Sequence, residues 1–104
     1  VDRFASVGAN QEWLSKRIRV PDDAKTLVLN SMGDVSVRIR NSEAGEGEVI
    51  PGFSYEDSNI PVQDAINNSV QWKQKDLKEL QGQLIRVEVL PRRNGRFYGF
   101  SFSN

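Results

Sequence analysis

The chain has 104 residues, with 14 basic and 14 acidic side chains, 38% hydrophobic residues, and neither cysteine nor histidine. This length is enough for one hydrophobic core, so we expect a single domain spanning residues 1–104. The absence of cysteine and histidine excludes disulfides, thiolate nucleophiles and the usual ligands of transition metals. No apolar run is long enough for a membrane-spanning helix, and the start at Val1-Asp2 suggests a module cut from a longer protein.

The first predicted strand covers residues 13–20, where apolar and polar residues alternate as they do in half-buried β-strands. Leu14 and Ile18 share one face of this strand, and Trp13 falls on the other. We therefore expect the Trp13 ring to face outward or to cover a sheet edge.

Two further strands are predicted at residues 26–30 and 35–40, and the Ser31-Met32-Gly33-Asp34 segment between them predicts a hairpin turn. Residues 41–48 are polar with two glycines and are expected to form an exposed loop. Extended structure resumes at residues 49–53.

An irregular segment is expected over residues 54–68, followed by a strand at 70–73 in which the parity of Trp72 places its ring in the core. Asp76 can then cap one short helical turn near residues 76–81, which ends at Gly82.

The last two strands are predicted at residues 85–89 and 97–102, joined by a hairpin with Asn94-Gly95 at its tip. Tyr98, Phe100 and Phe102 share one face of the final strand. The short strands, the frequent turns and the lack of a long helix predict an all-β fold. We expect an antiparallel β-sandwich of the jelly-roll or concanavalin-like type.

Several stretches of the second half resemble one family. The quoted residues are Ile50-Pro51-Gly52-Phe53-Ser54 with Glu56-Asp57-Ser58, then Val70-Gln71-Trp72-Lys73, Asp76-Leu77 with Leu80 and Gly82, and Phe97-Tyr98-Gly99-Phe100-Ser101-Phe102; Asp2-Arg3-Phe4 and residues 12–18 fit more loosely. Together they are similar to the C-terminal β-sandwich modules of β-propeller glycoside hydrolases, the family 32 invertases and inulinases and their bacterial relatives. Departures are the loop at 41–48, Gln63, and Arg92-Arg93.

The resemblance implies a non-catalytic accessory module of a secreted, periplasmic or cell-envelope carbohydrate-active protein, because the catalytic carboxylates of such enzymes belong to the propeller. Two roles stay open. In the first, the module binds a glycan weakly, with an anionic polysaccharide as one candidate; in the second, it braces an adjoining catalytic domain without a ligand of its own. A brace is expected to expose an apolar patch on one face.

Candidate ligand-binding residues are exposed aromatic rings, which stack on sugars, and guanidinium groups, which pair with sulfate or carboxylate. Trp13 is the best aromatic candidate, and Tyr55 could line a groove in the irregular segment. The arginines on predicted outer strand faces are Arg17, Arg19, Arg38, Arg40 and Arg86, which form either an anion platform or a solvated surface. Glu88 is expected to pair with neighbouring arginines at the surface.

Other chemistries have weaker support in the sequence. The acidic residues fall mostly in predicted turns, where carboxylates usually cap backbone amides, so no glycosidase pair is assigned. Asp22-Asp23 and Glu56-Asp57 are the places where a structural Ca²⁺ could bind, although no segment has a diagnostic ligand spacing. The net charge is −4 over residues 1–66 (seven basic, eleven acidic) and +4 over 67–104 (seven basic, three acidic). Zero overall charge and the lack of a recognised motif argue against a nucleic-acid partner.

Overall fold

The structure is a computed structural model that describes residues 11–43, 45, 47–60 and 67–103, with the side chains of residues 93 and 94 excepted. Its strands are β1 (Trp13–Leu14), β2 (Ile18–Arg19), β3 (Thr26–Asn41), β4 (Ser58–Asn59), β5 (Asn68–Trp72) and β6 (Leu84–Ser103). All described pairings are antiparallel, in the order β1-β6-β3-β5-β4, and β2 also pairs with β6. The expected all-β, antiparallel architecture is confirmed. No described helix is long and apolar enough to span a membrane.

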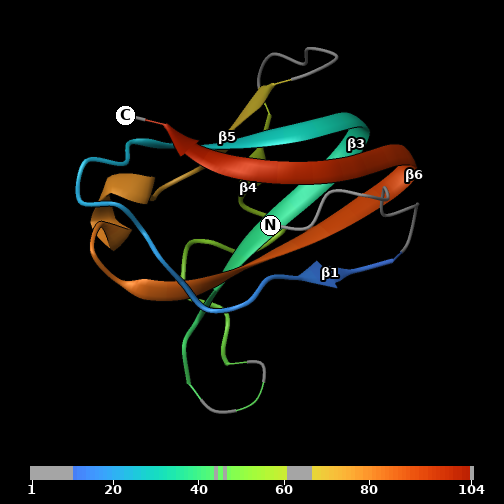
Figure 1. Cartoon of the computed structure of the whole chain (residues 1–104). Coiled ribbons are helices and arrows are strands. Elements are labelled where there is room, and N and C mark those ends of the chain that lie inside the picture. The colour runs from blue at the N-terminus through green and yellow to red at the C-terminus, as the bar shows by residue number, and fades with distance from the viewer. Residues whose placement is uncertain (1–10, 44, 46, 61–66, 104) are drawn as a thin grey trace.

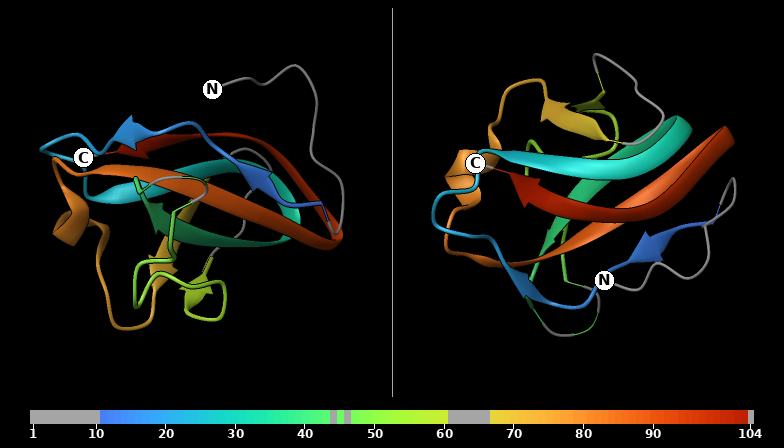
Figure 2. Two further views of the ribbon diagram at one scale, coloured as in Figure 1. Left: turned by 90° about the horizontal axis from the view of Figure 1, so that it is seen from below. Right: turned by 45° about the horizontal axis from the view of Figure 1, so that its top comes forward.

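Two long strands dominate the fold. β3 and β6 pair from Thr26 opposite Ser103 to Asn41 opposite Ile85. Figures 1 and 2 show them running side by side and turning back together at one end, so that each contributes to both halves of a bent sheet. The pairing register shifts at this bend, between Asn30 and Ser31 and again between Met32 and Asp34.

Both predicted hairpins in this region are wrong. Residues 31–34 and 91–95 lie within continuous strands, and the structure places them opposite each other at the bend. Glycine and polar residues mark bulges and bends as readily as hairpin turns, so the local pattern does not separate these cases. Gly33 has a φ of 72°, which a residue with a side chain rarely adopts.

The core lies on the inner face of the bent sheet. Its buried members are Val20, Ala24, Leu27, Leu29, Val35, Val37, Ile39, Phe53, Val70, Trp72, Leu77, Leu80, Ile85, Val87, Val89 and Phe97. The predicted burial of Trp72 is confirmed at 6% exposure, and its ring packs edge-on against Phe53 with centroids 5.1 Å apart. In the last strand Phe97 joins the core in place of Tyr98, because the register shift at the bend changes which side chains point inward.

The predicted helical turn is confirmed as η1 (Leu77–Leu80), a 3₁₀ turn. The Asp76 carboxylate accepts a bond from the Lys78 backbone N–H (3.0 Å), and the Glu79 side chain accepts one from the Asp76 backbone N–H (3.1 Å). This capping box fixes the turn, while Leu77 and Leu80 anchor it in the core.

The predicted strand over residues 13–20 is interrupted. Trp13 pairs with Val89 and Ile18 with Ile85, so one extra residue lies between β1 and β2. At this bulge the Ser15 hydroxyl, rather than a backbone carbonyl, accepts the bond from the Val87 N–H (2.9 Å). A one-residue slip reverses which side chains face the core, so Trp13 points inward and Leu14 outward.

Candidate functional site

Charged side chains gather on the outer face of the half-sheet formed by β1, β6 and β3. Because Val37, Ile39, Val87 and Val89 point into the core, the side chains that alternate with them point outward. We call the resulting group the outer-face cluster; its members are Glu12, Arg17, Arg38, Arg40, Tyr55, Arg86, Glu88 and Arg92. Four of the predicted arginines and Tyr55 are brought together in this cluster, and Arg19 instead donates to the Gly82 carbonyl (2.6 Å).

Glu88 lies at the centre of the cluster and is only 4% exposed. Its Oε1 accepts hydrogen bonds from the Nε atoms of Arg38 and Arg40, the latter at 2.8 Å. Burial alone raises the pKa of a carboxyl, but the hydrogen bonds and charges of Arg38 and Arg40 outweigh it and hold the pKa of Glu88 below its ordinary value. Glu88 pairs with arginines as expected, although it is buried rather than at the surface.

The Tyr55 ring packs against two arginines of the outer-face cluster, Arg38 and Arg92. The segment of residues 49–53 runs along the free edge of β3, where the Ile39 N–H donates to the Phe53 carbonyl (3.0 Å), and this places Tyr55 over the outer face. The guanidinium carbon of Arg38 lies 4.2 Å from the centre of the Tyr55 ring, and that of Arg92 lies 5.9 Å from it. At least one face of the ring is therefore occupied by a guanidinium group.

The Tyr55 hydroxyl donates to Glu12 Oε2 (3.0 Å), and the same oxygen lies 3.2 Å from an Arg38 terminal nitrogen. Burial, the charge of Glu88 and the hydrogen bond to Glu12 raise the pKa of Tyr55 well above its ordinary value, so the phenol stays protonated. Burial lowers the pKa of Arg38, but its bonds and charge interactions with Glu88 and its neighbours raise it overall. Tyr55 therefore stays neutral and Arg38 stays charged over the ordinary pH range.

Arg86 stands apart from this network. It lies directly opposite Arg40 in the β3–β6 pair, and its buried Nε has no hydrogen-bond partner among residues 11–43, 45, 47–60 and 67–103. The Arg17 side chain donates to the carbonyl oxygens of Ser42 (3.0 Å) and Glu43 (3.2 Å), at the end of β3. Arg17 precedes β2, which pairs with β6 on the side opposite β3, so these bonds join segments that lie on either side of β6. Arg40 and Arg86 thus place like charges directly opposite each other, which is unfavourable.

Trp13, the preferred aromatic candidate, does not lie on the outer face. Its ring packs against Phe97 and Phe100, with centroids 5.0 and 5.9 Å away. Of the two expected placements, the outward one is wrong, because the bulge at Ser15 reverses the parity of β1, and the ring instead packs against the core from the edge strand β1. Trp13 is partly exposed at the edge of the core, and a role for it in ligand binding stays a prediction.

Within the described residues, no three acidic side chains come close enough together to hold a metal ion. Of the places predicted for Ca²⁺, Asp57 accepts a bond from the Ser54 hydroxyl (2.8 Å), which closes a local turn. Some residues named from the sequence lie outside the described residues. These are Glu46 and Asp64 in the predicted loops, and Gln63 and Asp2-Arg3-Phe4, on which the family resemblance was judged.

Sequence reasoning missed Glu12 and Arg92 as members of the cluster. Glu12 precedes the first strand, and Arg92 lies in a segment that was predicted to be a turn. Arg92 would have been found if β6 had been recognised as continuous, because it has the same parity as Arg86 and Glu88. Glu12 carries no local signal, since its partners Arg38 and Tyr55 are distant in sequence.

Comparisons with known proteins identify no relatives: no family model matches the chain, and no curated protein or solved structure matches it significantly. The resemblance to the sandwich modules of β-propeller glycoside hydrolases therefore stays an expectation based on the quoted motifs.

Proposed function

We propose that this chain is a non-catalytic accessory module of a secreted or envelope carbohydrate-active protein, and that it binds an anionic glycan through the outer-face cluster. The observation that carries the proposal is Arg86, whose buried Nε has no hydrogen-bond partner within the described part of the chain and which lies directly opposite Arg40. A sulfate or carboxylate bound there would accept bonds from these groups and relieve the repulsion between them.

The balance of charge in the cluster supports an anionic ligand. Five arginines (Arg17, Arg38, Arg40, Arg86 and Arg92) face two carboxylates, those of Glu12 and Glu88. Arg38 and Arg40 share Glu88, and Arg38 also contacts Glu12, so the uncompensated charge lies toward Arg17 and Arg86. A glycan that carries one acidic group per sugar has the complementary charge.

The placement of the aromatic rings favours this mode over stacking on a neutral sugar. Arg38 covers one face of Tyr55, and Trp13 packs toward the core. The two rings that the sequence offered for stacking are thus engaged within the protein, whereas the buried Nε of Arg86 has no hydrogen-bond partner among the described residues.

The absence of a catalytic role is part of the proposal. Glu12 and Glu88 both contact Arg38, so they form the carboxylate pair in this cluster most similar to a glycosidase site. A glycosidase needs one carboxyl with a raised pKa to protonate the leaving group. The pKa of Glu88 is lowered, which makes it unsuited to that role.

The finer fold assignment belongs to the same proposal. A jelly-roll or concanavalin-like sandwich is supported by the way β3 and β6 each pass through both halves of the bent sheet, with the core on the inner face. The alternative role as a brace has less support. Among the described residues the exposed large hydrophobic side chains are Met32, at the bend, and Leu84, at the start of β6, and these do not form one patch.

Affinity electrophoresis tests the proposal. Gels that contain heparin, chondroitin sulfate or polygalacturonate should retard the wild-type chain, while gels that contain dextran or xylan should not, and added salt should weaken the retardation. Arg86→Gln should lose most of it. Arg96→Gln removes the same charge from an exposed position on the same strand and serves as the control. Equal mobility of the wild type and Arg86→Gln in every acidic gel would contradict the proposal.

A further inference from the structure

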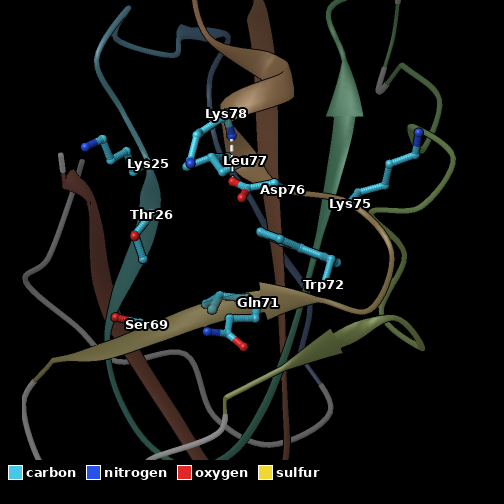
Figure 3. A pocket seen from close by; sticks show the side chains of 10 residues that line it. Lys25, Thr26, Ser69, Gln71, Trp72, Lys75, Asp76, Leu77 and Lys78 are labelled. Atoms are coloured by element: carbon cyan, nitrogen blue, oxygen red, sulfur yellow. Dashed lines mark hydrogen bonds between the residues drawn. The ribbon is translucent and has the colours of Figure 1, made fainter.

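A cavity of about 470 Å³ lies outside the outer-face cluster and shares no residue with it. Its walls come from the start of β3, from β5 and from the segment that enters η1 (Figure 3). The described lining residues are Lys25, Thr26, Ser69, Val70, Gln71, Trp72, Lys75, Asp76, Leu77 and Lys78. This volume falls within the roughly 300–1,000 Å³ typical of small-molecule sites.

The floor and the walls of the cavity differ in chemistry. Val70, Trp72 and Leu77 are core residues that reach the cavity from its inner side, and they provide a rigid apolar base. Figure 3 shows the Trp72 side chain extending from β5 into the space below η1. The Trp72 indole N–H is engaged with the Val37 carbonyl (3.4 Å), so the ring orientation is fixed before any ligand binds.

The polar lining side chains are largely unused. Within the described part of the chain, Lys25, Thr26, Ser69, Gln71 and Lys78 make no side-chain hydrogen bond or ion pair. These five residues supply two ammonium groups, two hydroxyls and one amide around a single space. Unengaged donors and acceptors in a concave site are the groups that fix the orientation of a bound small molecule.

The charge of the cavity is positive. The carboxylate of Asp76 is occupied in capping η1, and Lys75 lies 3.5 Å from Glu79 in an ion pair. The charges of Lys25 and Lys78 are therefore left without a partner among the described residues. A ligand that carries one negative group would receive charge-assisted hydrogen bonds from both.

We propose that this cavity binds a polyhydroxylated anion of monosaccharide size, such as a uronate or a sugar sulfate. Lys25 and Lys78 hold the carboxylate or sulfate, Thr26, Ser69 and Gln71 bond the hydroxyl groups, and the Trp72 side of the cavity contacts an apolar face of the ring. This inference is independent of the outer-face cluster, because it depends on different residues and a different charge group.

Tryptophan fluorescence provides the test, because Trp13 and Trp72 are the only tryptophans. In a Trp13→Phe background Trp72 is the sole reporter. Titration with glucuronate and with glucose 6-sulfate at low ionic strength should change its emission, and methyl glucoside should bind at least about tenfold more weakly, as expected for the loss of a charged hydrogen bond. Binding of glucuronate, of glucose 6-sulfate or of both supports the proposal and identifies the acidic group. Absence of binding by both anions overturns it.

Two double variants are matched in charge. Lys25→Gln/Lys78→Gln removes two positive charges from the cavity lining, and Lys16→Gln/Lys73→Gln, the control, removes two from exposed positions that do not line the cavity. The first pair should weaken binding at least about tenfold and the second should leave it unchanged. Chemical-shift changes of the Ser69, Gln71 and Lys78 amides in the otherwise unmodified chain give the same comparison without the Trp13 substitution.

Two outcomes would overturn the proposal even if an anion binds. One is equal affinity of the wild type and Lys25→Gln/Lys78→Gln. The other is loss of monosaccharide binding in Arg86→Gln, which would assign the ligand to the outer-face cluster. Conversely, Arg86→Gln can lose retention on acidic polysaccharides while monosaccharides still bind in the cavity, so the two proposals fail separately.

Discussion

Replacing Glu88 by glutamine should destabilise the domain more than any other single change in the outer-face cluster. The substitution keeps the size of the side chain and removes the charge that Arg38 and Arg40 share. Breaking a buried ion pair by removing one partner costs about 3–5 kcal/mol. Because the side chains of Arg38 and Arg40 remain 23% and 14% exposed and can be partly solvated, we expect about 2–3 kcal/mol here.

For a domain of this size, that loss corresponds to a fall in Tm of roughly 10–20 °C. Urea unfolding monitored by tryptophan fluorescence gives the free energy, and thermal circular dichroism gives Tm. Glu56→Gln is the control, because Glu56 follows Tyr55 in the chain and its carboxylate is exposed. This control substitution should change the free energy of unfolding by less than about 0.5 kcal/mol.

The same variant has a defined pH dependence. Since the folded pKa of Glu88 lies below its ordinary value of 4.5, the unfolded chain binds the proton first as pH falls. The stabilisation is therefore fully present above the unfolded pKa and is lost as pH falls through the folded pKa. The difference between the wild type and Glu88→Gln should be largest near neutral pH and shrink below about pH 4.5. A difference below 0.5 kcal/mol at pH 7, or one that grows with acidity, would refute this account of the cluster.

Three further changes probe other parts of the fold. Ser15→Ala removes the acceptor of the buried Val87 N–H and should cost about 1–3 kcal/mol, with faster hydrogen exchange at the Val87 amide; unchanged exchange would contradict the assigned bond. Tyr55→Ala removes the ring over Arg38 and should cost about 1 kcal/mol by urea unfolding, whereas Tyr55→Phe, which loses only an exposed bond to Glu12, should cost less than half of that. Gly95→Ala should destabilise by at least about 2 kcal/mol in thermal unfolding, because its Cβ would collide with the Asp34 carbonyl and the Arg92 backbone at the bend. Gly45→Ala, where a Cβ meets open space, should show only the roughly 1 kcal/mol strain of its positive φ, and equal effects at both positions would contradict the close packing at Gly95.

The features that local sequence determines were predictable. Alternation of apolar and polar residues over 85–89 places Ile85, Val87 and Val89 in the core, and Asp76 with Gly82 brackets the η1 turn. Each of these depends on residues within one strand or one turn. The parity of Trp72 likewise predicts its burial because β5 is short and unbroken.

The bend could not be predicted by the same means. The segments Ser31 to Asp34 and Pro91 to Gly95 both have the composition of hairpin turns. Each nevertheless stays within a strand, because the two segments lie opposite each other in the β3–β6 pair. Whether such a segment reverses the chain or bends it depends on which strand pairs with it. That partner is about 60 residues away in the sequence, and local propensity carries no information about it.

The bulge at Ser15 links the fold to the outer-face cluster. Without the extra residue, the parity of Ile18 would continue to Leu14 and place Trp13 on the outer face, which is one of the two placements that the sequence predicts. The slip turns Trp13 into the core and sets Leu14 directly opposite Glu88. An aliphatic side chain beside the carboxylate excludes water from one flank, while Arg38, Arg40 and Tyr55 occupy the others, and a less solvated ion pair is stronger. The same slip that moves the expected sugar-stacking ring off the surface therefore helps to build the buried charge centre around which the arginines are arranged.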